Sequence, residues 1–268
     1  MNAWRILSGV IAFAVTFSHF GFFAAYGAEM NVSNSKTDSG VVGVSVSTNT
    51  DKRIRIGIHA AGGDKEYYFT YDKKEGDIDI PLIFGNGKYE VRLYEEVNNN
   101  YYMLCDTYSV DLQMEDYDAI YLSSSVIVPW GGAEKTIAKA GGLTKLKKND
   151  FDKFTAIYKY VTENVIYDMT REAESGYRSS PDTTLAEGSG ICLDIAVLLA
   201  SMLRCSGIKC KLVYGRSSEM EGTHSWNEVY LNDKWVVVDP TKDSLCYVSQ
   251  KPYKYAKLPK FYKSVYSF

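Results

Sequence analysis

Hydrophobic and polar residues alternate with a period of two through the first half of the chain, from Val41 to Val128. Alternation of this kind predicts β-strands with one buried and one exposed face. Asn86-Gly87 and Asn98-Asn99-Asn100 separate apolar runs, and such residues favour the turns of hairpins. The pattern predicts strands over residues 41–48, 53–59, 66–72, 78–84, 88–97, 101–112 and 120–128.

Short strands joined by turns at this spacing are typical of an immunoglobulin-like sandwich. We therefore expect an all-β sandwich domain over residues 40–128. Residues 28–39 precede it and are polar, so they are expected to form a flexible lead-in. This half carries no motif typical of an enzyme, and any chemistry is expected in the second half.

The apolar spacing becomes helical in the second half. Residues 129–149 are rich in glycine and lysine and are expected to be a linker, ending at Asn149, which is suited to cap a helix. Apolar residues then recur at helical spacing from Phe151 to Val165, and a polar loop follows. Residues 192–204 are apolar on almost all sides, which predicts a buried helix. Two strands near the end complete an α+β catalytic domain, expected over residues 150–268.

Composition limits the classes of function. The chain has 268 residues, of which 46% are hydrophobic, and a net charge of −3, so its charge gives no reason to expect a nucleic-acid partner. Residues 1–27 combine Arg5, an apolar run and small residues near Gly27, which predicts a signal peptide. The alternative is an uncleaved anchor, because about 20 apolar residues can span a bilayer. In either case we expect a secreted or cell-surface protein that meets the membrane only through this segment.

Cysteine and histidine are few. An exported protein with five cysteines can form two disulfides and keep one cysteine as a free thiol, as a cysteine nucleophile requires. Cys205 and Cys210 flank a short turn and could pair, but the disulfide pattern stays open. The chain has three histidines and no metal-site spacing, so we expect neither a metal nor a cofactor.

Cys192 lies where the predicted buried helix begins, directly after a glycine-rich turn. Unpaired backbone N–H groups and the positive end of the helix dipole meet there, and both favour a thiolate. His224 is the only histidine of the second half and is the candidate base. A two-residue loop at Asn232-Asp233 would place Asp239 diagonal to His224 on the same face of a hairpin. The three side chains together predict a Cys–His–Asp triad.

Three separated blocks of sequence carry a family resemblance. Gly190–Ala196, His224–Val229 and Trp235–Thr241 resemble the core of the transglutaminase-like superfamily of papain-type cysteine enzymes. With the export signal, the chain is similar to exported bacterial members of that superfamily, over roughly residues 148–241. The resemblance implies a transglutaminase-like, that is papain-like, α+β fold for this part of the chain.

The resemblance also implies roles for individual residues. Cys192 would be the nucleophile, His224 the base and Asp239 the acid that orients it. Tyr167 stands near the position of a family tryptophan and would help to bind the oxyanion, and Trp226 would line the site. Calcium activation is not implied, because the acidic clusters of the animal members are not found.

A thioester intermediate follows from these roles, with a peptide or protein amide as substrate. Water would then give deamidation or proteolysis, and an amine would give transamidation. The alternatives are a cysteine peptidase of the same fold and a non-catalytic adhesion or scaffold module. Lysines recur at every third position from Lys251 to Lys263 and make cell-envelope components candidate partners, although a strand that packs its aromatic residues explains them as well.

Overall fold

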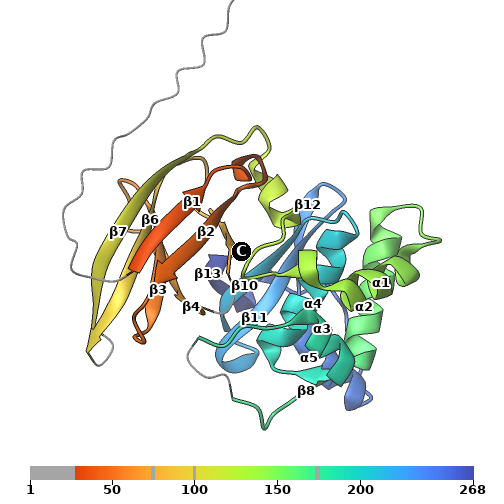
Figure 1. The fold of residues 1–268 in the computed structure, drawn as a ribbon. Coiled ribbons are helices and arrows are strands. Elements are labelled where there is room, and N and C mark those ends of the chain that lie inside the picture. Colours follow the sequence, from red (N-terminus) through yellow and green to blue (C-terminus); the bar gives the residue numbers. More distant parts are fainter. Residues whose placement is uncertain (1–27, 74–75, 99–100, 173–175) are drawn as a thin grey trace, which may run out of the picture.

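The computed structural model describes residues 28–73, 76–98, 101–172 and 176–268. The predicted signal peptide over residues 1–27 lies outside the described residues. None of the helices within the described ranges is long and apolar enough to cross a membrane. The chain forms an N-terminal β unit and a C-terminal unit of helices packed on a sheet, which lie side by side (Figure 1).

Two antiparallel sheets make up the N-terminal β unit. Their strands enclose one core that includes Val42, Ile56 and Leu93, all fully buried. The alternation of the sequence explains this core, because inward residues at every second position meet between the two sheets. The first sheet has the order β1-β2-β5 and the second the order β4-β3-β6-β7. The strands are β1 (Ala28–Ser33), β2 (Val41–Thr48), β3 (Ile54–Ala60), β4 (Glu66–Tyr71), β5 (Ile78–Pro81), β6 (Gly87–Asn98) and β7 (Tyr101–Leu112).

Two expectations about this unit were wrong. The predicted flexible lead-in contains strand β1, which pairs with β2 and buries Ala28 and Val32. The segment has only three alternating apolar positions, Ala28, Met30 and Val32, and polar residues surround them, so the alternation was too short to predict a strand. No strand spans residues 120–128; instead a 3₁₀-helix, η2 (Tyr117–Leu122), begins where the Asp116 side chain accepts a 3.1 Å hydrogen bond from the N–H of Asp118. That cap favours a helical turn over an extended strand.

The C-terminal unit surrounds the helix α4 (Cys192–Cys205), which is buried from Asp194 to Arg204. Helices α1 (Glu134–Thr144), α2 (Asp150–Asn164) and α3 (Pro181–Glu187) contact it, as do two strands of a sheet. The sheet has the order β12-β11-β10-β13. The remaining elements are β8 (Ile166–Tyr167), β9 (Ser189–Gly190), β10 (Cys210–Ser217), β11 (Met220–Leu231), β12 (Lys234–Val238), α5 (Pro240–Val248), β13 (Tyr262–Ser267) and the 3₁₀-helices η1 (Thr37–Ser39), η3 (Trp130–Gly132) and η4 (Pro259–Phe261).

The expected linker over residues 129–149 was also wrong, because it contains α1. Thr136 and Ala140 of this helix are fully buried, and α1 contacts α4. Gly141 and Gly142 weaken the helical propensity there, so packing against α4 rather than local preference stabilises the helix.

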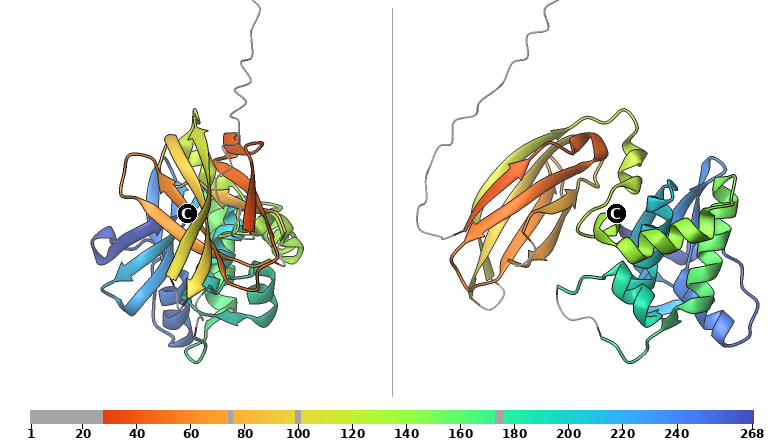
Figure 2. Two further views of the ribbon diagram at one scale, coloured as in Figure 1. Left: turned by 60° about the vertical axis from the view of Figure 1, so that its left-hand side comes forward. Right: turned by 45° about the vertical axis from the view of Figure 1, so that its right-hand side comes forward.

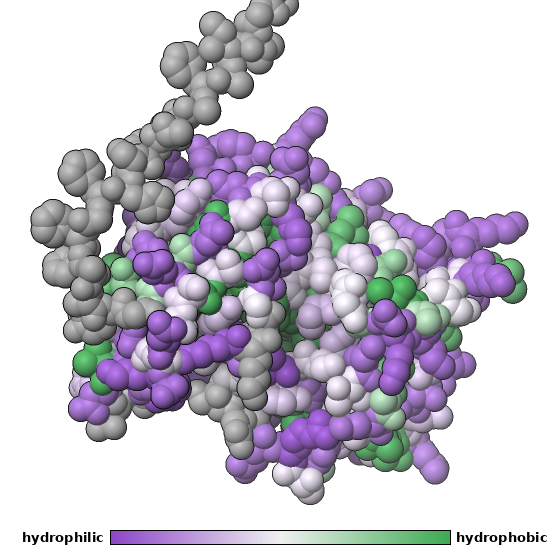
Figure 3. Space-filling model, viewed as in Figure 1, coloured by the Kyte–Doolittle hydropathy of each residue, from purple (hydrophilic) through white to green (hydrophobic). Residues whose placement is uncertain are grey.

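The C-terminal strand β13 joins the two units. It pairs with β10, while the ring of Phe268 lies 5.2 Å from that of Tyr67 in β4. The Tyr266 hydroxyl donates a 3.0 Å hydrogen bond to the backbone oxygen of Glu66. The right-hand view of Figure 2 shows the C-terminal end between the units. The face shown in Figure 3 is mostly hydrophilic, with small scattered apolar areas over both units.

Candidate active site

Cys192 stands at the start of α4 because a short parallel pairing precedes it. Tyr167 of β8 lies opposite Gly190 of β9, and Ile191 is extended before the helix begins. Cys192 is partly exposed, whereas the helix that follows is buried. A helix leaves the N–H groups of its first turn without intrahelical acceptors, so the thiol lies beside unpaired donors.

The hairpin of β11 and β12 has the predicted register. Leu231 lies opposite Lys234, and the pairing continues to Asn227 opposite Val238. Asn232 has φ 50° and the next residue φ 60°, so the two-residue loop is a type I′ turn, which matches the twist of the strands. This register places the next residue after Val238 on the same side as His224.

His224 and Asp239 are in direct contact. Nε2 of His224 lies 2.8 Å from Oδ2 of Asp239, and both side chains are buried, with 2% and 0% exposed. The Cys192 side chain interacts with the same imidazole and helps to raise its pKa. Because Nε2 faces the carboxylate, Nδ1 is the nitrogen available to the thiol. The structure thus brings Cys192, His224 and Asp239 together.

The protonation of His224 follows from these neighbours. Burial lowers the pKa of His224, but the hydrogen bonds to Asp239 and to Cys192 and the negative charge of both partners outweigh burial and raise the pKa to about 9. His224 is therefore an imidazolium at neutral pH. A positive charge beside the sulfur stabilises a thiolate.

Asp239 is held by three donors. Besides His224, its Oδ1 accepts a 3.0 Å hydrogen bond from the N–H of Lys242, which caps α5. The hydroxyl of Tyr262 donates to Oδ2 at 3.0 Å. Tyr262 lies in β13 and was not expected in the site. The alternation near the C-terminus predicts at most a strand, and it does not say which strand this one pairs with.

Tyr167 lies near Cys192, as the resemblance implied. It stands on β8, beside the strand that leads into α4. Burial and the negative charge of Cys192 both raise the pKa of Tyr167. Its phenol therefore stays a hydrogen-bond donor at neutral pH.

Trp226 does not line an open site. It is 1% exposed, and its ring lies 6.1 Å from that of His224 and 5.2 Å from that of Tyr262. It packs behind the imidazole on the same face of β11, so it supports the site from the interior and cannot reach a substrate.

A second set of contacts surrounds the start of α4. Oδ2 of Asp194 accepts a 3.0 Å hydrogen bond from the N–H of Ile191, and Oδ1 accepts one of 2.8 Å from the Tyr177 hydroxyl. Arg171 lies 3.7 Å from the same carboxylate. An acid at the third position of a helix is a capping signal, so Asp194 could have been found from the sequence, whereas its distant partners could not.

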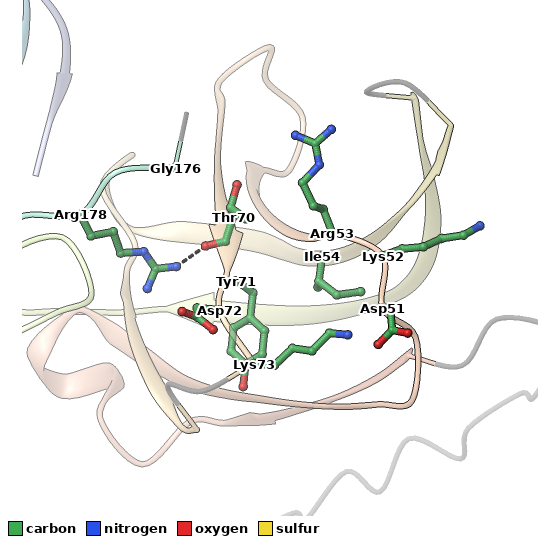
Figure 4. A pocket seen from close by; sticks show the side chains of 10 residues that line it. All are labelled: Asp51, Lys52, Arg53, Ile54, Thr70, Tyr71, Asp72, Lys73, Gly176 and Arg178. Atoms are coloured by element: carbon green, nitrogen blue, oxygen red, sulfur yellow. Dashed lines mark hydrogen bonds between the residues drawn. The ribbon is translucent and has the colours of Figure 1, made fainter. Parts of the chain in front are cut away.

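The loop that carries Tyr177 also contacts the N-terminal β unit. Arg178 donates a hydrogen bond to the backbone oxygen of Thr70 in β4 (Figure 4). Arg178, Thr70 and Gly176 line an open hollow of about 580 Å³ together with residues 51–54. Neither Cys192 nor His224 is among its lining residues, so the hollow is separate from the candidate site. Across the described ranges, no group of three or more His, Cys, Asp and Glu side chains is arranged to hold a metal ion.

The sequence of the part of the chain that carries these residues matches a known family. The family model described as the transglutaminase-like superfamily matches residues 137–240. The chain carries a transglutaminase-like domain. The matched residues begin inside α1 and end directly after Asp239.

Curated relatives of this domain are distant. The chain is 24% identical over 144 residues to the kyphoscoliosis peptidases of Homo sapiens and Mus musculus. The match covers 50% of this chain and 21% of each relative, so the chain spans about a fifth of their length.

Solved structures similar to this chain include two bacterial proteins. The periplasmic domain of TgpA from Pseudomonas aeruginosa is 13% identical, with 80% of this chain and 93% of that chain covered and a TM-score of 0.39. LapG from Legionella pneumophila is 20% identical, with 51% of this chain and 74% of that chain covered and a TM-score of 0.38.

Proposed function

We propose that this protein is a cysteine-dependent enzyme that attacks peptide or protein amides through a thioester intermediate. One observation carries the proposal: the buried His224 ring lies 2.8 Å from Asp239 and interacts with the partly exposed thiol of Cys192. A nucleophile, a base and a group that orients the base are the parts that acyl transfer requires.

The first half of the reaction forms the thioester. The thiolate of Cys192 attacks the amide carbonyl carbon, and the C–N bond breaks as the tetrahedral intermediate collapses. The imidazolium of His224 gives its proton to the departing nitrogen, which leaves as ammonia or an amine. Its raised pKa of about 9 keeps that proton available at neutral pH.

The second half releases the acyl group. Water or a primary amine attacks the thioester carbonyl, His224 takes the proton of the attacking group, and the sulfur of Cys192 leaves as thiolate. The Asp239 carboxylate stabilises the imidazolium in both halves. The N–H of Cys192 and the hydroxyl of Tyr167 are the proposed donors to the oxyanion.

The acceptor decides the outcome. Attack by an amine on a glutaminyl thioester gives transamidation, and attack by water gives deamidation. Proteolysis, the second candidate, results if the amide is in the main chain. It is supported by the sequence match to the two kyphoscoliosis peptidases, over about half of this chain.

The remaining proposals concern the rest of the chain. The sequence of residues 1–27 supports export, to the outside of the cell or to its surface. There the enzyme would meet its protein or peptide substrates and components of the cell envelope. The two sheets of the N-terminal β unit are proposed to be an immunoglobulin-like sandwich, on the strength of seven short antiparallel strands around one core.

The decisive experiment compares the thiols. The purified protein is treated with iodoacetamide at pH 7, and the rate at each cysteine is measured by mass spectrometry. We expect Cys192 to react at least tenfold faster than Cys246, which is also partly exposed but stands on α5. His224→Ala should remove the difference, and Cys246→Ala, the control variant, should leave the Cys192 rate unchanged. Equal rates in the wild-type protein would favour a non-catalytic scaffold.

The acceptor is identified separately. The protein is incubated with a glutamine-containing peptide, a labelled primary amine and a mixed peptide library. Amine incorporation indicates transamidation, a mass increase of one dalton per site indicates deamidation, and new chain ends indicate proteolysis. Each product should be lost in Cys192→Ala.

A further inference from the structure

Tyr262 contacts the proposed catalytic carboxylate from outside the matched domain. It begins β13, beyond the residues 137–240 that the family model covers. Its hydroxyl donates to Oδ2 of Asp239 at 3.0 Å, and the same oxygen lies 2.8 Å from Nε2 of His224. Two donors therefore share one carboxylate oxygen.

The fold places Tyr262 there through a close approach of two strands. Tyr262 lies opposite Ser217 in the pairing of β13 with β10. A Cβ at Gly215 of β10 would lie 2.2 Å from the backbone oxygen of Lys263 and 2.9 Å from the Trp226 ring. Only glycine lets β13 and Trp226 come this close, and the Tyr262 ring then packs on Trp226.

The Tyr262 hydroxyl acts as a donor in this position. Burial raises the pKa of Tyr262 well above its usual range, and the charges of Asp239 and Glu219 raise it further, so the phenol keeps its proton. It has one proton for two acceptors, Oδ2 of Asp239 at 3.0 Å and Oε2 of Glu219 at 3.3 Å. The shorter contact is to Asp239.

We propose that Tyr262 is a positioning residue of the site: its hydroxyl holds the Asp239 carboxylate toward His224 and takes up part of the negative charge on the shared oxygen. This inference rests on the proposed function, because His224 and Asp239 form a catalytic site only under that proposal. Without the hydroxyl, Oδ2 would face the imidazolium alone, the carboxylate would attract the ring proton more strongly, and His224 would release that proton at a higher pH.

Other ionisable groups near Asp239 have partners of their own. Lys242 pairs with Glu219, and Asp243 pairs with Lys257 and accepts a 2.6 Å hydrogen bond from the Tyr158 hydroxyl. The groups that face Asp239 from the elements around it are His224 on β11, Tyr262 on β13, Lys242 and Asp243 on α5 and Tyr158 on α2. Glu219, between β10 and β11, contacts Tyr262 and Lys242.

The test is the titration of His224 itself. The protein is labelled with ¹⁵N-histidine, and the ring nitrogens are followed by NMR from pH 5 to pH 11; only three histidines contribute signals. We expect a midpoint of about 9 for His224 in the wild-type protein. Tyr262→Phe keeps the ring on Trp226 and should raise the midpoint by about half a unit to one unit, as the loss of a hydrogen bond to a charged group allows.

Tyr266→Phe is the matched control. It removes a hydroxyl from the same strand, one that bonds Glu66 instead of the site, and should leave the midpoint unchanged. Tyr262→Met, which also lacks the hydroxyl, replaces Tyr262→Phe if the latter does not fold. An unchanged or lowered midpoint in the Tyr262 variant, or an equal rise in both variants, overturns the proposal.

Failure of the proposed function is distinguishable from failure of this inference. The NMR titration needs no turnover, so it reports on Tyr262 even if Cys192 proves unreactive. If Cys192 is reactive, its alkylation rate is measured against pH. The pH at which this rate changes on the alkaline side should move upward in Tyr262→Phe, together with the His224 midpoint. A change that stays at the same pH while the rate falls at every pH would show a merely structural role and overturn the proposal.

Discussion

The hydroxyl of Tyr177 donates a 2.8 Å hydrogen bond to Oδ1 of Asp194, two residues after the cysteine. The other oxygen of this buried carboxylate accepts the N–H of Ile191, one residue before it. The next residue in the loop, Arg178, bonds the backbone of Thr70 in β4. The N-terminal β unit thus supports a loop that itself supports the helix start on which the thiol stands.

Loss of the Tyr177 hydroxyl should reduce the reactivity of Cys192. Tyr177→Phe leaves Asp194 with one hydrogen-bond partner fewer, and a hydrogen bond to a charged group contributes about 1.5–3 kcal/mol. We expect the alkylation rate of Cys192 at pH 7 to fall about threefold to tenfold. Tyr101→Phe, on a side chain that is 77% exposed in the β unit, is the control and should leave the rate unchanged. A wild-type rate in Tyr177→Phe would contradict a role for this contact.

A methyl group at Gly190 should disturb the same helix start. Its Cβ would lie 2.6 Å from Cβ of Asp194, so one of the two segments must move. We expect Gly190→Ala to lower the free energy of unfolding by about 1–3 kcal/mol, as overpacking does, when measured by urea denaturation.

Gly142→Ala provides the comparison for that substitution. Gly142 lies in α1, where an added Cβ meets nothing within 4 Å. The same change of residue should stabilise the protein there by about 0.5–1 kcal/mol, because alanine favours a helix. Equal effects at both glycines would contradict the steric argument.

Stability should depend on pH through His224. The folded pKa of about 9 lies above the ordinary value of 6.5, so the folded state binds the proton more tightly than the unfolded state. The contribution is fully present below about pH 6.5 and is lost as pH rises through 9. It amounts to at most about 3.5 kcal/mol, since each pKa unit corresponds to about 1.4 kcal/mol.

Urea denaturation at pH 6.5 and pH 9.5 measures this contribution. The wild-type protein should be less stable at the higher pH. Asp239→Asn removes the charge that helps to raise the His224 pKa, so the difference between the two pH values should become smaller in that variant. A difference of the same size in both proteins would assign the pH dependence to other groups.

Arg204 should be intolerant of lysine. Its guanidinium is buried and donates to the backbone oxygens of Cys210 at 2.9 Å, Ser123 at 2.8 Å and Phe268 at 2.6 Å. Burial lowers its pKa to about 10, yet it remains charged at pH 7. Lysine cannot reproduce the planar fork, so Arg204→Lys should cost about 2–3 kcal/mol of unfolding free energy. Stability within 0.5 kcal/mol of the wild-type protein would show that the fork is not needed.

Local patterns predicted much of the fold. Six of the strands in the first half follow directly from alternation, because each buries one face against a common core. The register of the β11–β12 hairpin followed from Asn232-Asp233, since a two-residue loop determines which residues share a face. Strand β1 and helix α1 were missed because their local signals are weak and their stability comes from distant partners.

The sequence by itself determined which side chains form the core of the candidate site. Cys192 at a helix start, and His224 and Asp239 on one face of a hairpin, are consequences of neighbours along the chain. Only the tertiary structure decided that Tyr262 shares Oδ2 of Asp239, and that a loop held by the β unit supports α4. The reason is physical: turn geometry and periodicity act over a few residues, whereas these contacts depend on how separate elements pack.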